Sequence, residues 1–123
     1  MPRSLVGTLA TVAVCVGPLA TAAAAETAPV QITLKDHRFT PAEIHLPMGQ
    51  PTLLEVTNAD ATPEEFEMRQ LAIEKVIVGG GKTRVRLRPL GPGRYQFIGE
   101  FNEATAHGTI VVDPGGAPEP KPQ

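Results

Sequence analysis

The sequence predicts an all-β fold, an antiparallel β-sandwich of seven or eight strands. Apolar and polar residues alternate in short runs, which places every second side chain on a buried face. Turn residues separate these runs at regular intervals, and the chain has 12 glycines and 13 prolines in 123 residues to supply them. No run carries a sustained helical period, so strands must form the core.

The first half of the predicted domain contains four strands. Apolar residues alternate with polar ones in the first three, and turn residues end each run. In the fourth, Phe66 and Met68 alternate with Glu65 and Glu67, so the two carboxylates share the face opposite the core. These strands are expected at residues 30–35, 43–46, 52–57 and 65–68.

The second half adds three or four strands. The run 71–78 is either a separate strand or a continuation of the one before it. Three consecutive glycines then turn the chain, and a run with Val85 and Leu87 inward and arginines outward follows. The arginine stripe is expected to be a solvated face, with a docking surface for an acidic partner as the alternative. The last three strands are expected at residues 82–88, 94–98 and 107–112.

The ends of the chain are expected to lie outside the domain. Residues 1–25 have a basic start, an apolar run and a small-residue exit, which is typical of a cleaved secretory signal peptide. An uncleaved membrane anchor is the alternative, although the run is shorter than the ~20 apolar residues of a span. Val12-Ala13-Val14 before Cys15 does not favour a lipid anchor. The domain is expected over 26–113, and a disordered Pro-rich tail over 114–123.

Composition excludes several functions for the predicted mature chain, Glu26–Gln123. Its 10 basic and 13 acidic residues (11 basic less Arg3) give a net charge of −3, which disfavours nucleic acid and anionic membrane partners. It has no cysteine, so its stability must come from the core or a metal. The only serine, Ser4, is lost with the signal, and no nucleophile–His–acid set predicts a hydrolase.

Three segments carry a resemblance to a known family: 39–44 (Phe-Thr-Pro-Ala-Glu-Ile), the Asn58 loop leading into Glu65-Phe66-Glu67, and 89–97 with Gly108-Thr109-Ile110-Val111-Val112. Together they resemble cupredoxins, and most of all the EfeO-type cupredoxin-like domains of bacterial periplasmic iron uptake. The resemblance covers about residues 30–113. It implies a Greek-key β-sandwich with a metal site at one end.

The chain departs from the blue-copper members of this class. A blue-copper site needs a cysteine thiolate and two histidines. Gly99 stands at about the place of the thiolate, and the Glu64–Glu65 region replaces the expected histidine. EfeO-type domains often carry cysteines near the positions of Phe39 and Gly99 here. A type 1 blue copper centre is therefore not expected, nor is a thiol-containing copper or zinc site.

The remaining candidate ligands are carboxylates and imidazoles, which suit iron, Mn²⁺ and Cu²⁺. Glu100 follows the strand of Tyr95, where the resemblance places the metal end, and His107 closes that loop. A solvated strand face, a salt bridge or a hydrogen-bonded loop histidine is the alternative for each candidate. The predicted metal set is Glu65, Glu67, Glu74, Glu100, His37 and His107.

These observations leave three alternative functions. By resemblance, the chain is a periplasmic metal-binding protein that binds iron, oxidises or delivers it, and works with an inner-membrane Ftr-type iron permease and a periplasmic partner protein. The second alternative is a non-blue copper-binding protein, because affinity order favours Cu²⁺ over Fe²⁺ at such sites. The third is a metal-free docking module.

Overall fold

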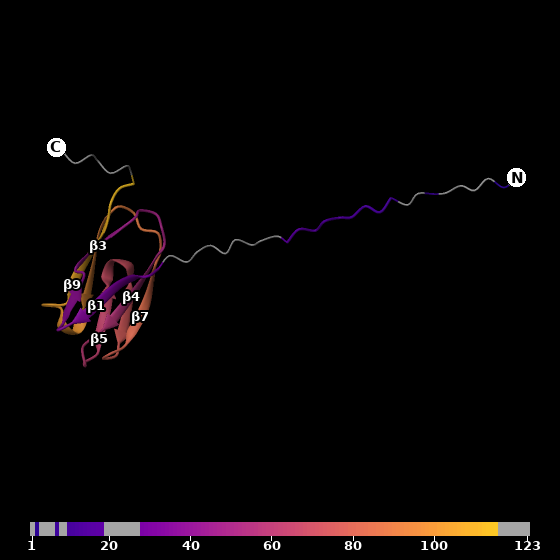
Figure 1. Ribbon diagram of the computed structural model, residues 1–123. Helices are drawn as coiled ribbons and strands as arrows, with labels where there is room; N and C mark the ends of the chain where they lie inside the picture. The colour runs from indigo at the N-terminus through magenta and orange to yellow at the C-terminus, as the bar shows by residue number, and fades with distance from the viewer. Residues whose placement is uncertain (1, 3–6, 8–9, 19–27, 116–123) are drawn as a thin grey trace, which may run out of the picture.

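The computed structural model describes residues 2, 7, 10–18 and 28–115, and the predicted cleavage site and most of the predicted tail lie outside them. Two short 3-10 turns, η1 (Arg69–Leu71) and η2 (Glu100–Asn102), interrupt the strands. Within the described residues, nine strands form the sandwich (Figure 1): β1 (Val30–Lys35), β2 (Arg38–Thr40), β3 (Glu43–Leu46), β4 (Thr52–Asn58), β5 (Glu64–Met68), β6 (Ile73–Ile77), β7 (Lys82–Leu87), β8 (Gly93–Gly99) and β9 (His107–Val112).

The strands form two sheets that pack face to face. The four-stranded sheet has the order β2-β1-β4-β7, and the five-stranded sheet has the order β3-β9-β8-β5-β6. The β-sandwich prediction is confirmed, but the purely antiparallel pairing is wrong. β1 pairs with β4 and β3 pairs with β9 in parallel. Alternation along a strand reveals its buried face and not its direction, so the sequence pattern could not show these pairs.

The predicted strand count falls short of the observed nine. β2 lies between the expected strands 30–35 and 43–46, and Phe39 in its centre is buried. The run 71–78 is a separate strand and not a continuation, because Ala72 adopts a left-handed conformation (φ 53°) after η1 and turns the chain back. β6 then pairs antiparallel with β5 along its full length.

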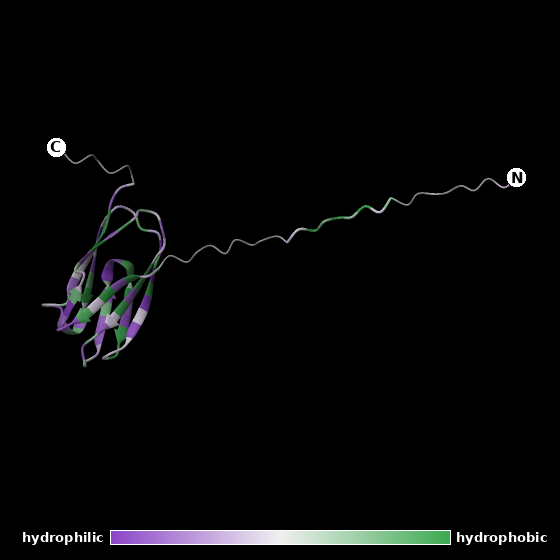
Figure 2. Cartoon of the chain, viewed as in Figure 1, coloured by the Kyte–Doolittle hydropathy of each residue, from purple (hydrophilic) through white to green (hydrophobic). Residues whose placement is uncertain are grey.

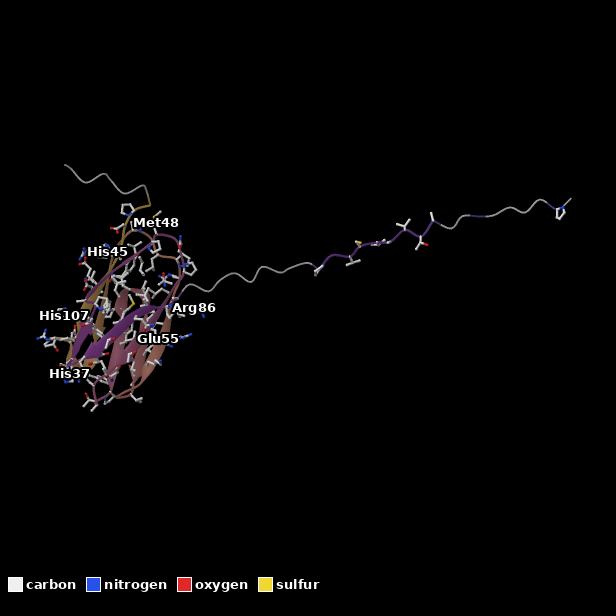
Figure 3. All side chains as sticks on the ribbon, viewed as in Figure 1. His37, His45, Met48, Glu55, Arg86 and His107 are labelled. Carbon is white, nitrogen blue, oxygen red and sulfur yellow. The ribbon has the colours of Figure 1, made fainter. Side chains whose placement is uncertain are left out.

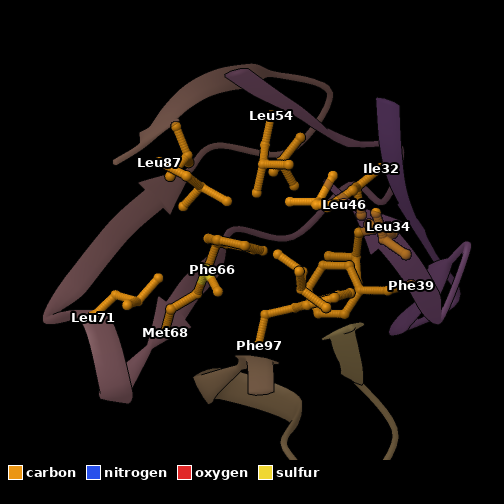
Figure 4. Packing of buried hydrophobic residues seen from close by; sticks show 14 of the residues in the cluster. Ile32, Leu34, Phe39, Leu46, Leu54, Phe66, Met68, Leu71, Leu87 and Phe97 are labelled. Atoms are coloured by element: carbon orange, nitrogen blue, oxygen red, sulfur yellow. The ribbon is translucent and has the colours of Figure 1, made fainter. Parts of the chain in front are cut away.

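The core lies between the sheets, where the inward residues of the alternating strands meet. Green and purple residues alternate along the strands in Figure 2, as expected for one buried and one exposed face. Phe39, Phe66 and Phe97 form its aromatic centre (Figure 4), with ring centroids 5.2–6.0 Å apart. Phe66 and Phe97 are fully buried, and each stabilises the fold by about 1.5–3 kcal/mol on area alone.

We call one end of the sandwich the loop end. β1, β4 and β8 finish there, and β5 and β9 begin there. Buried Asn58 organises it: its Nδ2 donates to the carbonyls of Thr62 (2.8 Å) and Ile77 (3.1 Å), and its Oδ1 accepts from the Asp60 N–H. Within the described residues, no helix has the length and apolar character needed to cross a membrane.

Candidate metal site at the loop end

Two of the predicted ligands lie on the outer face of β5. Phe66 and Met68 face the core, so Glu65 and Glu67 face outward, as the alternation predicted. Glu67 is nevertheless only 8% exposed. Arg69 Nε donates to its Oε1 at 3.1 Å, while its buried Oε2 has no hydrogen-bond partner among the described residues. A buried carboxylate oxygen without a partner lowers the stability of the fold. Glu67 is therefore the residue of this site that most needs a bound partner.

Glu100 joins this pair from the neighbouring strand. β8 meets β5 with Phe66 opposite Gly99 and Glu67 opposite Ile98, and the same register continued by one residue brings Glu100 opposite Glu65. The negative charges of Glu67 and then Glu65 raise the pKa of Glu100 above its ordinary value. Three carboxylates therefore share one patch, and we call Glu65, Glu67 and Glu100 the acidic cluster.

Arg69 partly neutralises this cluster. Its guanidinium contacts Glu67 and also bonds Glu103 through Nη1 (3.2 Å) and Nη2 (3.4 Å). The hydrogen bond and charge of Glu103, followed by the charge of Glu67, raise the pKa of Arg69. The arginine thus ties η1 to the end of η2 and holds Glu67 by one oxygen.

Glu74 and His107 lie on the same cross-strand row as Glu67 but at different distances. Glu74 is its direct neighbour on the edge strand β6 and is exposed. On the other side Ile98 faces Glu67, and His107 faces Ile98. Strands are about 4.8 Å apart, so His107 is two spacings, roughly 10 Å, from Glu67 with Ile98 between them.

His37 lies at the loop end (Figure 3) but belongs to a different set of contacts. Its backbone N–H donates to Asp60 Oδ2 at 2.9 Å, and its Nδ1 is 3.6 Å from the same oxygen. The backbone hydrogen bond of His37 is the largest cause that lowers the pKa of Asp60. Asp60 therefore anchors the turn after β1, and this is the contact that His37 makes.

The acidic cluster is not a finished coordination sphere. Over the described part of the chain, no group of three or more His, Cys, Asp or Glu side chains is arranged to hold a metal ion. Glu67 is fixed, whereas Glu65 is only partly buried and Glu100 is exposed. A cation would therefore have to draw the Glu65 and Glu100 side chains toward Glu67.

Glu64 also contributes to this end of the sandwich, although it is not among the predicted ligands. It is 1% exposed and faces the core side of the loop end. Its Oε1 accepts from the Phe101 N–H (2.8 Å) and the Glu65 N–H (3.1 Å), and its Oε2 accepts from Asn102 Nδ2 (2.8 Å). It thereby fixes η2, the turn that carries Glu100. Its position at the start of a strand after Pro63 was the available signal.

The residues present do not fit a blue-copper centre. The Glu64 carboxylate occupies the space beside Gly99, where a Cβ atom would lie 2.6 Å from Glu64 Cδ and 2.8 Å from the Ala106 Cβ. Both Glu64 oxygens already accept hydrogen bonds from the protein. A thiolate at residue 99 has no room while Glu64 is in place.

A second charged group lies away from the loop end. His45 Nε2 contacts Glu43 Oε1 at 2.9 Å, and its Nδ1 contacts Asp113 Oδ2 at 3.1 Å. The hydrogen bonds to Asp113 and Glu43 raise the pKa of His45. Figure 3 shows His45 toward the end of the sandwich opposite His37. These ion pairs join β3 to the residue that follows β9.

Comparisons with known proteins identify the fold. Residues 8–112 match the cupredoxin-like domain family. An uncharacterized protein of Rickettsia prowazekii (strain Madrid E) is 40% identical over 84 residues, which cover 68% of this chain and 67% of that protein.

Solved structures share the fold of this chain, although their sequence identity to it is low. The metal binding domain of the Cu(I) exporting P-type ATPase CopA of Streptococcus pneumoniae is 21% identical with a TM-score of 0.62, over 68% of this chain and 83% of that one. A purple cupredoxin from Nitrosopumilus maritimus is 17% identical with a TM-score of 0.52, over 68% and 99%. At these identities the likeness concerns the fold alone.

Proposed function

Because this chain belongs to the cupredoxin-like domain family, we propose that it is a periplasmic metal-binding protein whose cargo is iron, held by the acidic cluster. The observation that carries the proposal is the buried, unpartnered Oε2 of Glu67 beside two further carboxylates. Hard oxygen ligands suit Fe²⁺ and Fe³⁺, and a cation among them would relieve the repulsion that raises the pKa of Glu100.

The resemblance to EfeO-type domains adds delivery of the ion to the proposal. The signal-like segment 1–25 supports export, and the protein would then deliver its ion to an inner-membrane Ftr-type iron permease, together with a periplasmic partner protein. Carboxylates favour Fe³⁺ over Fe²⁺, so bound iron would be easier to oxidise.

Anaerobic titration with Fe²⁺ tests the site. The wild-type protein should bind the ion, and Glu67→Gln should weaken binding at least tenfold because it removes the only fixed carboxylate of the cluster. Glu55→Gln is the matched control, since Glu55 is also a strand carboxylate paired with an arginine, Arg84 at 3.0 Å, but lies on the other sheet. Equal affinity of Glu67→Gln and the control would exclude the acidic cluster.

Non-blue copper binding is the second candidate. Two facts favour it: the copper named for solved relatives of the same fold, and the order of metal affinities, in which Cu²⁺ exceeds Fe²⁺. Growth of a strain that lacks the gene distinguishes a role in iron binding from a role in copper binding. A defect under iron limitation supports iron, and a defect only under copper stress supports copper.

A further inference from the structure

A groove of about 350 Å³ adjoins the acidic cluster on the outer face of the five-stranded sheet. It exists because β5 pairs with β8 at only two positions before η1 leads the chain away. The residues that line it come from β8 and from the segment that leaves β5: Glu67, Arg69, Gln70, Arg94, Gln96 and Ile98.

Side-chain hydrogen bonds replace strand pairing along this part of β8. Gln70 takes the place of the departed strand: its Nε2 donates to the Arg94 carbonyl at 3.1 Å, and its Oε1 accepts from the Gln96 N–H at 2.8 Å. The backbone of β8 is therefore satisfied without a neighbouring strand at this point. The groove is a built feature of the sheet, and its volume lies in the range of small-molecule sites.

The two ends of the groove differ in charge. Glu67, with its unpartnered oxygen, marks one end next to Ile98. Arg94 marks the other end, four residues or roughly 13 Å along β8. Its guanidinium has one weak ion pair, with Glu43 Oε2 at 3.7 Å, so it retains donors for a ligand. Gln96, on the same face of β8, lies between Ile98 and Arg94.

We infer that the groove receives a small polycarboxylate chelate of the metal ion, an inference that rests on the proposed function. A free anion could pair with Arg94, but it would leave the Glu67 oxygen without a partner. A bare cation gains nothing from Arg94. A chelate presents both charges: its metal faces Glu67 and the rest of the acidic cluster, and a carboxylate at its far side accepts hydrogen bonds from Arg94.

Titrations with three probes test the inference: Fe³⁺–citrate, citrate alone and anaerobic Fe²⁺. We expect Arg94→Gln to weaken the binding of Fe³⁺–citrate about tenfold, as for loss of a charge-assisted hydrogen bond, and to leave Fe²⁺ affinity within twofold. Arg94→Lys, which keeps the charge but not the planar fork, should fall between wild type and Arg94→Gln. Arg84→Gln, on the other sheet, is the control and should change neither affinity.

The outcomes separate this inference from the proposed function. If Arg94→Gln binds the chelate as tightly as wild type, or if citrate alone binds as well as the chelate, the groove is not a chelate site. If wild type binds Fe²⁺ but not Fe³⁺–citrate, the inference fails and the proposed function stands. If wild type binds neither iron probe, both fail.

Discussion

Glu64 Oε2 accepts a hydrogen bond from Asn102 Nδ2 at 2.8 Å, and this buried contact joins the start of β5 to η2. With the Phe101 N–H on the other carboxylate oxygen, it fixes the turn next to the acidic cluster. The buried space beside Gly99 thus contains a carboxylate and its donors.

The first prediction concerns this contact. Glu64→Leu leaves the Phe101 N–H and the Asn102 amide without their acceptor, so we expect the free energy of unfolding to fall by about 2–4 kcal/mol. Urea denaturation followed by circular dichroism measures it. Glu65→Leu, at a neighbouring position that reaches solvent, should change stability by about 0.5 kcal/mol or less. Equal stability of the two variants would show that the Glu64 contacts contribute nothing.

Gly99→Ala tests the close approach at the same point. The added Cβ would lie 2.6 Å from Glu64 Cδ and 2.8 Å from the Ala106 Cβ, so the carboxylate must move. We expect a loss of about 1–3 kcal/mol in the free energy of unfolding. Gly91→Ala, whose added Cβ would have no atom within 4 Å except those of its chain neighbours, is the control and should remain near wild type. A stable Gly99→Ala protein would mean that this end of the core is looser than the structure shows.

Glu100→Gln should stabilise the protein at pH 7. The charges of Glu67 and Glu65 raise the pKa of Glu100, so its ionised form is disfavoured in the folded state. The penalty is absent below the ordinary value of 4.5 and grows as the pH rises through the folded pKa. The melting temperature of Glu100→Gln should therefore exceed that of wild type at pH 7 and match it at pH 3.5. A lower melting temperature at pH 7 would contradict the clustering.

His45→Gln should have the opposite dependence on pH. Hydrogen bonds to Asp113 and Glu43 raise the pKa of His45 above its ordinary value of 6.5. The stabilisation is fully present below that value and disappears as the pH rises through the folded pKa. The urea midpoint of His45→Gln should be lower than that of wild type at pH 5.5, and the two should converge at pH 9. A difference independent of pH would point to packing and not to charge.

Much of the fold could be predicted from the sequence because its strands alternate regularly. The bounds of β1, β3 and β9 agree with the expected runs, and Leu54 and Val56 are buried as their spacing predicts. β2 was missed because it has only three residues. A run that short contains too few alternating positions to be distinguished from a turn.

The candidate site could be predicted only in part. Glu65 and Glu67 share a face through local alternation, but their approach to Glu100 depends on the β5–β8 register. Glu64 was missed because the expected strand began at Glu65, and a carboxylate at the edge of a turn is usually solvent-exposed. Two of its donors, the Phe101 N–H and the Asn102 amide, lie 37 and 38 residues away in sequence, so no local pattern predicts them. The separation of His107 from Glu67 by Ile98 likewise requires the strand order.

The most direct test of the acidic cluster is amide NMR during titration with Mn²⁺, a paramagnetic ion with the same preference for oxygen ligands. If the acidic cluster binds the ion, substoichiometric Mn²⁺ broadens the resonances of Glu65, Glu67 and Glu100 first and spares Glu55 on the opposite sheet. Broadening that begins instead at Asp60 or Asp113, or that affects all acidic residues equally, would contradict it.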